Sequence, residues 1–350
     1  MSKKKRIAVV GAGDIGRRHM QAIQLDGTAV LAAIVDPAPL GASVAQMLGV
    51  PYFTDLPSMN AAMGPDGIII AAPNSQHVSL ATHCIESGTP VLVEKPIADD
   101  IADAYRLADL SERSGVPVLV GHHRRHNPHI QRARAIVRDG SLGAITAVSA
   151  TWLVRKPDDY FKVAWRTRAG GGPILINMIH DIDCLRFVVG EIEAVTGITS
   201  HSRRALEVED TAAAILRFEN GALATIVLSD ATPAPWSWEL TAGEHTSYTY
   251  PKIAADCYQI AGTMASLAVP SLRLWNYDGD QSWQAPLTER RADVDTGDAL
   301  VRQIGHFVDV IGGATKPIIT ARDAARTLEV TLAVSAAART RTEVAIRGRA

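Results

Sequence analysis

Residues 6–36 read RIAVVGAGDIGRRHMQAIQLDGTAVLAAIVD, and this stretch decides the fold. A short apolar run leads into a glycine-rich turn and then a segment rich in helix formers, which predicts a strand, a tight turn and a helix. A second apolar run, residues 30–35, ends at Asp36. In this order, the spacing of Gly11, Gly13 and Gly16 predicts a dinucleotide-binding unit. A glycine turn in some other α/β domain is the alternative.

Each part of this stretch suits a nucleotide. Gly11 allows a sharp bend, Gly13 leaves room for a pyrophosphate, and Gly16 lets the helix pack close to the strand. The helix N-terminus offers unpaired N–H groups to the anion. Asp36, twenty positions after Gly16, can accept hydrogen bonds from both ribose hydroxyls. NAD is favoured over NADP because Asp36 would repel a 2′-phosphate and no arginine follows it within the next several residues.

Composition limits the kind of protein. The chain has 350 residues, 47% of them hydrophobic, which is enough for two domains with separate cores. The formal net charge is −2 with both signs interspersed, which favours small-molecule partners over nucleic acid or an anionic membrane. The three cysteines lie far apart without a C-x-x-C pair, which argues against a disulfide framework or a structural zinc site. Neither a secretion signal nor an apolar run of about 20 residues is seen, so a cytoplasmic protein is expected.

The first 121 residues alternate between apolar runs and helical segments. Runs such as residues 68–72 and 91–93 are continuous, as in strands buried on both faces of a parallel sheet. About five or six such strands predict a doubly wound sheet, whose ligands bind at the carboxyl ends of the strands. Asn74, Lys95 and the residues after Gly121 follow such strands and are site candidates by position.

From Pro128 onward the pattern changes to strands joined by short turns. It predicts a second α/β domain with a large, mostly antiparallel open sheet. We expect residues 1–123 to form a Rossmann dinucleotide-binding domain and residues 124–350 to form a domain for substrate binding and oligomerisation. The expected helices are residues 130–138, 173–189, 297–311 and 321–338, and the expected strands are residues 145–154, 194–199, 212–218, 223–228, 238–241, 247–250, 257–261, 266–269 and 272–275.

Five motifs occur in a fixed order: GAGDIG with Asp36, AAPNSQH, EKP, GHHRRHNP and GGGPILINMIHDID. With them, residues 5–335 resemble the Gfo/Idh/MocA oxidoreductases, the family of inositol dehydrogenase and glucose-fructose oxidoreductase. The resemblance implies a Rossmann domain, an NAD cofactor, and a homodimer or homotetramer formed through the open sheet. It implies that the cofactor-binding residues are Gly11, Gly13, Asp14, Ile15, Gly16, Asp36, Pro73, Asn74, His77, Glu94, Lys95 and Arg124.

Lys95 is the first catalytic candidate. Oxidation of a secondary alcohol needs a hydride acceptor, a base for the hydroxyl proton and a group that stabilises developing oxyanion character. Lys95 suits the last role because it ends a buried strand beside the expected nicotinamide, where desolvation lowers the pKa of a lysine from roughly 10.4. A surface lysine is the alternative. Glu94 is expected to orient Lys95 or to hold the cofactor ribose.

The helix expected from Pro173 carries the second catalytic candidate. Helical spacing gives it one polar face, made of Asn177, His180, Asp183 and Cys184. A polar face on such a helix suggests that it lines a cleft. With an ordinary pKa of about 6.5, His180 is the natural base at neutral pH, and a hydrogen-bonded structural histidine is the alternative. Asp183 could hold substrate hydroxyls or orient His180.

One position departs from the family pattern. Inositol dehydrogenase-like members carry an aspartate four residues before the histidine, where this chain has Ile176. Asn177 can supply a neutral hydrogen bond but cannot act as a base. The proton relay is therefore expected to depend on His180 and Lys95, and inositol becomes a weaker candidate for the substrate.

Two polar loops complete the site hypothesis. In the loop 122–129 the consecutive histidines point in different directions and no Cys or acid accompanies them, so no metal site is expected. The resemblance places this loop next to the nicotinamide and the substrate. The stretch 155–166 is polar and aromatic, which suits sugar recognition, and a solvated loop is an equal alternative. The expected substrate-binding residues are Asn177, Asp183, Lys156, Tyr160, Arg166 and His123.

The leading hypothesis is an NAD-dependent dehydrogenase acting on a CH–OH group of a sugar, cyclitol or related polyol. In it His180 is the general base and Lys95 assists. Two other hypotheses come from the same resemblance, because some relatives use tightly held NAD in a transient oxidation that cleaves a glycosidic bond, and others are non-catalytic ligand-sensing regulators. Such regulators tend to lose the lysine or the histidine, and this chain has both.

Overall fold

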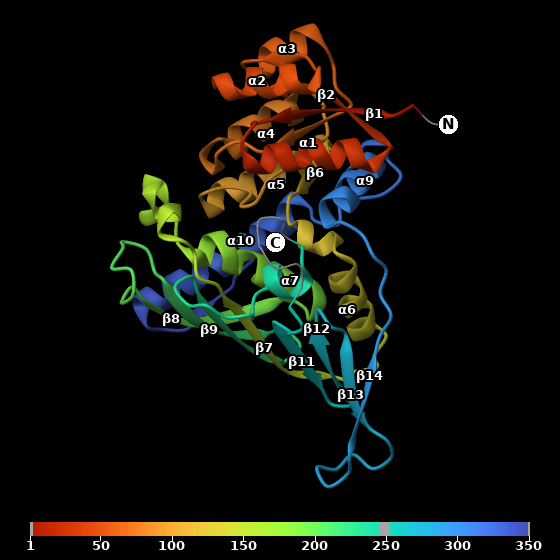
Figure 1. Ribbon diagram of the computed structural model, residues 1–350, viewed down its shortest axis with the longest axis vertical. Helices are drawn as coiled ribbons and strands as arrows, with labels where there is room; N and C mark the ends of the chain where they lie inside the picture. The colour runs from red at the N-terminus through yellow and green to blue at the C-terminus, as the bar shows by residue number, and fades with distance from the viewer. Residues whose placement is uncertain (1–2, 245–252, 349–350) are drawn as a thin grey trace. The chain divides into compact units, whose positions relative to one another are not determined.

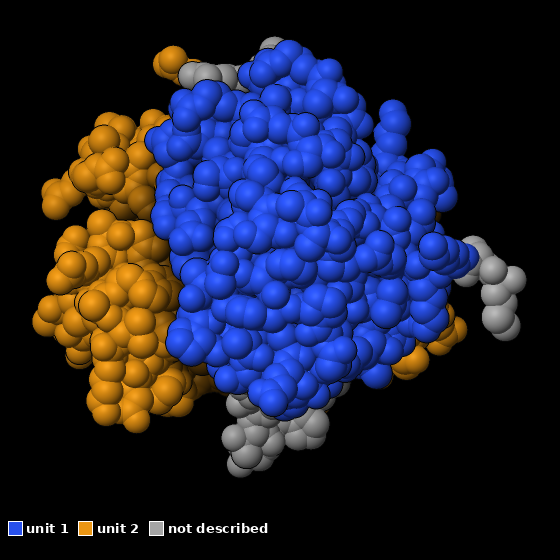
Figure 2. All heavy atoms as spheres, turned by 90° about the horizontal axis from the view of Figure 1, so that it is seen from above, with its two compact units in different colours: residues 1–126, 297–328 blue, residues 127–296, 329–350 orange. Residues whose placement is uncertain are grey.

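The computed structural model describes residues 3–244 and 253–348, and its helices and strands are labelled in Figure 1. The chain divides into two compact units, each assembled from two segments (Figure 2). The first unit contains residues 1–126 and 297–328, and the second contains residues 127–296 and 329–350. Within the described ranges, no helix is long and apolar enough to cross a membrane.

The first unit is built on a six-stranded parallel sheet with the order β3-β2-β1-β4-β5-β6. The order runs outward from β1 in both directions, so a topological switch point lies between β1 and β4, where such sheets bind ligands. This confirms the predicted doubly wound fold. The strands are β1 (Lys5–Val10), β2 (Ala29–Val35), β3 (Tyr52–Phe53), β4 (Gly67–Ile70), β5 (Val91–Val93) and β6 (Val118–Val120).

The carboxyl ends of five strands lie level across this sheet. Val10 pairs with Val35 on one side and with Ile70 on the other, and Val93 and Val120 continue the same row. The residues that follow these ends are therefore neighbours along one edge of the sheet. They include the glycine loop, the acid after β2 and the EKP turn after β5.

Close packing explains two of the loop glycines. Gly11 has a φ of +100°, and a Cβ built there would lie 2.4 Å from the carbonyl oxygen of Ala71. A Cβ at Gly16 would lie 2.0 Å from the carbonyl oxygen of Gly11, so a side chain at either position would displace the loop. The helices of this segment are α1 (Asp14–Asp26), α2 (Pro39–Leu48), α3 (Leu56–Ala62), α4 (His77–Glu86) and α5 (Ile101–Ser114).

The structure corrects the expected domain division at its C-terminal side. The first boundary, after residue 126, is close to the expected one, but residues 297–328 join the first unit rather than the second. In this segment α9 (Ala299–Ile311) packs on α1, and the N–H of Val120 donates to the carbonyl oxygen of Ile319 at 3.2 Å. The following helix, α10 (Ala321–Thr340), is divided between the two units.

The second unit is built on a nine-stranded sheet with the order β14-β13-β12-β11-β7-β10-β9-β8-β15. Only the pair β7 and β10 is parallel among these pairings, which confirms the prediction of a mostly antiparallel sheet. The strands are β7 (Ile145–Leu153), β8 (Ile192–Ser200), β9 (Thr211–Phe218), β10 (Leu223–Ser229), β11 (Tyr258–Gly262), β12 (Ala265–Val269), β13 (Arg273–Tyr277), β14 (Leu287–Arg291) and β15 (Val344–Ala345).

Helices cover one face of this sheet. Figure 1 shows α6 (Pro128–Arg138) and α7 (Ile179–Val188) on that face, with α10 beside β8. Along β7, Val148, Ala150 and Trp152 are buried at every second position, as expected for a strand with one covered face. The opposite face is open and carries exposed apolar side chains, among them Ile215 and Leu223.

One expected element of this unit was wrong, and one strand was missed. The segment 238–241 is not a strand but the short helix α8 (Trp238–Ala242), capped by Ser237, whose hydroxyl oxygen accepts from the N–H of Leu240 at 3.4 Å. The strand β14 was not expected, because its sequence LTERR is exposed throughout and lacks an apolar alternation. The strand expected at residues 247–250 lies outside the described residues.

Candidate active site

The glycine loop and Asp36 form the first part of the candidate site, in the first unit. Gly13 is the N-cap of α1, it is exposed, and no atom lies within 4 Å of the position a Cβ would take. One carboxylate oxygen of Asp36 accepts from the N–H of Ala12 at 2.7 Å, and the other accepts from the N–H of Ala38 at 2.8 Å. The loop therefore offers open space at a helix N-terminus and a carboxylate fixed beside it, as a dinucleotide requires. Asp14 and Ile15 start α1 and lie in the same loop.

The chain after β4 provides Pro73, Asn74 and His77. Asn74 begins a 3-10 turn (Asn74–Gln76) with Pro73 as its N-cap. His77 is buried, and its two ring nitrogens lie 2.9 Å from the carbonyl oxygen of Ala72 and 2.8 Å from that of Pro96. His77 thus connects the end of β4 to the turn after β5.

Glu94 and Lys95 directly follow β5 and lie within a group of ionisable side chains. Glu94 is buried, and one of its oxygens lies 2.7 Å from Nε2 of His19, while the other accepts from the N–H of Lys95 at 3.1 Å. Burial alone would raise the pKa of Glu94, but the hydrogen bond and charge of His19, with the charge of Lys95, hold it below its usual range. Glu94 therefore carries a negative charge beside Lys95, a half-buried residue.

His123 and Arg124 lie in the 3-10 turn His123–His126 that follows β6. Burial lowers the pKa of His123 well below its usual value, although the charge of Glu94 opposes this change. His123 is therefore neutral at pH 7. The structure thus brings His123 together with Glu94 and Lys95. Among the described residues, no group of three or more His, Cys, Asp or Glu side chains is arranged to hold a metal ion.

In the second unit, the polar helix begins differently from the expected one. Residues Ile174–Met178 form a π-helical turn, in which the N–H of Ile179 donates to the carbonyl oxygen of Ile174, and the α-helix α7 starts only at Ile179. The expected α-helical spacing therefore holds for His180 and Asp183, both buried on α7, but not across the turn to Asn177. Wide turns of this kind occur often at functional sites.

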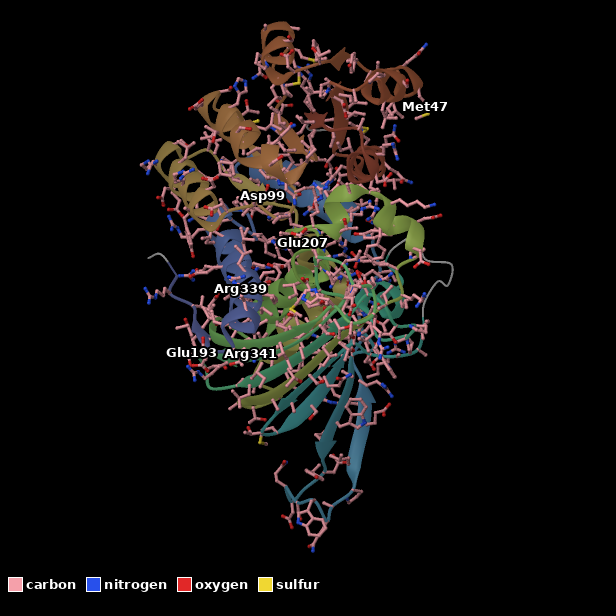
Figure 3. All side chains as sticks on the ribbon, turned by 90° about the vertical axis from the view of Figure 1, so that its left-hand side faces the viewer. Met47, Asp99, Glu193, Glu207, Arg339 and Arg341 are labelled. Carbon is pink, nitrogen blue, oxygen red and sulfur yellow. The ribbon has the colours of Figure 1, made fainter. Side chains whose placement is uncertain are left out.

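A half-buried acid supports this turn. Glu209 accepts from the N–H of Ile174 at 2.8 Å, and burial raises the pKa of its carboxyl group, which the hydrogen bond from Ile174 partly offsets. Glu207, labelled in Figure 3, accepts from the N–H of Ala169 at 3.2 Å. Two acids of one strand connection thus hold the loop that precedes Asn177.

Lys156 contacts several of the expected substrate-binding residues. Its Nζ donates to Oδ1 of Asn177 at 2.9 Å and lies 4.6 Å from the centre of the Tyr160 ring. The guanidinium group of Arg166 lies 4.0 Å from the centre of the same ring. Burial lowers the pKa of Lys156 to about 8, although the charge of Asp230 works in the opposite direction.

Sequence reasoning missed three residues that contact expected site residues, two in the second unit and one in the first. Asp230 follows β10, is buried, and lies 3.6 Å from Nζ of Lys156 and 2.9 Å from Nε of Arg204. His19, on α1, holds Glu94. An acid two positions after the apolar run 223–228 was a readable signal for Asp230. Arg204 and His19 gave no comparable signal.

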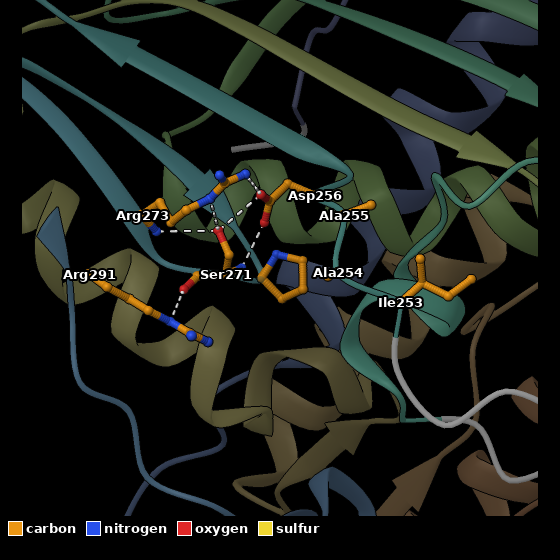
Figure 4. A pocket seen from close by; sticks show the side chains of 8 residues that line it. Ile253, Ala254, Ala255, Asp256, Ser271, Arg273 and Arg291 are labelled. Atoms are coloured by element: carbon orange, nitrogen blue, oxygen red, sulfur yellow. Dashed lines mark hydrogen bonds and ion pairs between the residues drawn. The ribbon is translucent and has the colours of Figure 1, made fainter. Parts of the chain in front are cut away.

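A separate cavity of about 460 Å³ lies in the second unit beside β12 and β13 (Figure 4). Its polar groups bond to one another: Asp256 accepts from the N–H of Ser271 at 2.7 Å and from Arg273 at 2.9 Å, and Nε of Arg291 donates to the carbonyl oxygen of Ser271 at 2.9 Å. None of the expected site residues lines this cavity, and we assign it no function.

The first unit, with its glycine loop, fixed acid and level strand ends, has the fold of a dinucleotide-binding domain. A sequence profile described as the oxidoreductase family, NAD-binding Rossmann fold, matches residues 5–122, and the GFO/IDH/MocA C-terminal domain profile matches residues 130–268. The chain belongs to the Gfo/Idh/MocA family of oxidoreductases, and its first unit is an NAD-binding Rossmann domain.

Two individual relatives show how similar the chain is to other proteins. The chain is 31% identical over 188 residues to the rhizopine catabolism protein MocA of Rhizobium meliloti, covering 53% of this chain and 57% of that protein. It is 31% identical over 190 residues to an inositol 2-dehydrogenase of Rhizobium meliloti, covering 53% of this chain and 55% of the relative. The matched region thus spans little more than half the length of these two relatives.

Solved structures share the whole fold. An oxidoreductase from Agrobacterium radiobacter, in complex with NAD⁺, L-tartaric acid and magnesium, superposes with a TM-score of 0.82 at 21% identity, covering 98% of this chain and 99% of that one. This likeness concerns the fold alone.

Proposed function

We propose that this protein is an NAD-dependent dehydrogenase that transfers a hydride from a secondary alcohol of a sugar, cyclitol or related polyol to the nicotinamide. The observation that carries the proposal is the level row of strand ends in the first unit, which sets the glycine loop, Asp36, Glu94 and Lys95 along one edge of an NAD-binding sheet. Relatives named as dehydrogenases of inositol support the choice of a polyol.

NAD, when bound, would accept the hydride released from the C–H bond of the carbinol carbon, and His180 would take the hydroxyl proton, which leaves a ketone. Lys95 stabilises the negative charge that develops on the oxygen. Glu94, which is ionised and accepts from the backbone N–H of Lys95, positions this residue. Asn177 is a neutral amide held by Lys156, so it contributes hydrogen bonding and no proton transfer.

The direct test is a spectrophotometric screen for NAD reduction over sugars, cyclitols, sugar acids and dihydrodiols. We expect NADH to form with at least one class. Cofactor that co-purifies and forms no net NADH while a glycoside is cleaved would replace this proposal by transient oxidation. Ligand-dependent partner binding without any turnover would replace it by a sensing role.

We also propose that the protein works in the cytoplasm as a homodimer or homotetramer, joined through the open face of the nine-stranded sheet. Apolar side chains are exposed on that face, and Ile198, Ile215 and Leu223 each present more than half of their surface to solvent (68%, 52% and 53%). Patches of this kind mark protein interfaces.

The charge of Lys156 gives a pH-dependent prediction. With a pKa of about 8, the ammonium group is mostly present at pH 7 and mostly lost at pH 9. If Lys156 binds the substrate as a cation, KM should rise about 10-fold from pH 7 to pH 9, in proportion to the protonated fraction. A Lys156→Arg variant keeps its charge over this range, so its KM should change by less than about 2-fold. The measurement is KM at several pH values for both proteins, and parallel curves would contradict the prediction.

A further inference from the structure

A second cavity of the second unit lies beside Lys156 and is rich in arginine. It has a volume of about 420 Å³ and is formed by the loop after β7, the connection between β8 and β9, and the residue after Asp230. Arg155, Arg203 and Arg204 line it together with Phe161. The concentration of cations is notable because the whole chain has a formal net charge of −2.

Arg204 forms a fixed wall of this cavity. Its guanidinium group lies 4.1 Å from the centre of the Phe161 ring, and its side chain is only 11% exposed. Nε of Arg204 bonds to a carboxylate oxygen of Asp230 at 2.9 Å, and a terminal nitrogen donates to the carbonyl oxygen of Lys156 at 3.0 Å. Because Asp230 also faces Nζ of Lys156, the arginine cavity and the Lys156 group adjoin each other.

The connection that carries Arg203 and Arg204 is itself held in place. Buried Asp210 accepts from the N–H groups of both residues, at 2.8 and 2.9 Å, through one carboxylate oxygen. The next residue, Ala205, has a φ of 53°, so the chain turns sharply there. A preorganised backbone lets these arginines receive a ligand with little ordering cost.

The carboxylates that contact these cations most closely are engaged or lie in solvent. Asp210 is engaged by backbone N–H groups, Asp230 is shared between Lys156 and Arg204, and Asp158 is a largely exposed side chain 3.6 Å from Arg204. Arg155 and Arg203 are exposed and lie on the cavity wall. Guanidinium groups match carboxylate and phosphate oxygens in pairs of hydrogen bonds.

We propose that this cavity binds an anionic group of the substrate, so that the protein oxidises an acidic sugar or polyol rather than a neutral one. The anionic group is a carboxylate or a phosphate, which share this chemistry. The inference rests on the proposed dehydrogenase function and narrows its substrate class.

The test compares matched substrates in NAD reduction: neutral aldoses and alditols, the corresponding sugar acids, and the corresponding sugar phosphates. We expect kcat/KM to be at least about 10-fold higher for one anionic series than for its neutral partners, and the preferred series identifies carboxylate or phosphate. In an Arg155→Ala/Arg203→Ala double variant, kcat/KM for the anionic series should fall about 10- to 100-fold further than for the neutral series. Arg138→Ala removes an exposed arginine of α6 and is the matched control, for which neither series should change.

The two proposals can fail separately. Equal kcat/KM for neutral and anionic series, or equal losses of both in the double variant, would overturn the anionic substrate while leaving a dehydrogenase. If no sugar reduces NAD, equilibrium dialysis with D-glucuronate and with inorganic phosphate tests whether the cavity binds an anion, independently of turnover. Binding at least about 10-fold weaker in the double variant than in the native protein and Arg138→Ala would support it, and equal binding in all three would overturn it.

Discussion

Replacing Lys95 or His180 by alanine should lower kcat by about 10²- to 10⁴-fold while NAD still binds, because each substitution removes a group that stabilises charge or moves a proton in the transition state. Lys95 follows β5 beside ionised Glu94, and His180 is 8% exposed on α7. Neither lies in the glycine loop, so the pyrophosphate and ribose contacts should persist. The measurements are kcat with the substrate found in the screen and NAD affinity by equilibrium dialysis.

Two controls match these variants. Lys316→Ala removes an exposed lysine of the first unit, and His83→Ala removes a half-buried histidine of α4 that bonds to Asn60 at 3.2 Å. Both should keep native kcat. Lys95→Arg distinguishes charge stabilisation from proton transfer, because it preserves the charge but transfers a proton poorly. Native turnover in either alanine variant would remove that residue from the chemistry.

The architecture of the first unit could be predicted because its signals are local. Each apolar run of the parallel sheet is continuous, so the strands can be found without knowing their partners. The right-handed crossover rule and level strand ends then bring residues after different strands to one edge. For this reason Asn74 and Lys95 could be placed at that edge from sequence position alone.

The membership of residues 297–328 could not be predicted in this way. An amphipathic pattern shows that α9 buries one face, and its buried residues Ile304 and Phe307 follow such a pattern. It does not show which surface that face meets, because α1 lies almost 300 positions earlier in the chain. Such a contact belongs to tertiary packing, and no pattern in the local sequence identifies the partner helix.

The second half of the candidate site shows the same limit. Assigning Asn177 to the face of His180 assumed an α-helix throughout, whereas the π turn depends on a hydrogen bond from Ile174 to Glu209, 35 positions away. The pairing of Lys156 with Asp230 depends on the parallel register of β7 and β10. Composition did identify the 155–166 stretch as polar and aromatic, and Lys156, Tyr160 and Arg166 do lie together.

Replacing Asp36 should change which dinucleotide binds. In the native protein both carboxylate oxygens are fixed by the N–H groups of Ala12 and Ala38, at 2.7 and 2.8 Å, so the charge stands at a defined place after β2. A carboxylate there accepts hydrogen bonds from ribose hydroxyls and repels a 2′-phosphate. Loss of a hydrogen bond to a charged group weakens binding by about 1.5–3 kcal/mol, so Asp36→Ser should weaken NAD binding about 10- to 100-fold and strengthen NADP binding.

The quantity to measure is the ratio of the NAD and NADP affinities, determined by equilibrium dialysis. The proteins compared are the native protein, Asp36→Ser, Asp36→Asn and a control, Glu86→Gln. The control removes an exposed charge at the end of α4. The preference for NAD should fall about 10²-fold or more in Asp36→Ser, and Glu86→Gln should leave it unchanged.

Asp36→Asn separates charge from shape: its amide keeps one acceptor, so one of the two backbone N–H groups loses its partner and the loop loosens. If Asp36→Asn loses affinity for both dinucleotides equally, Asp36 acts by holding the loop, whereas a selective gain for NADP means that the charge itself discriminates. An unchanged ratio in Asp36→Ser would show that this carboxylate does not contact the ribose.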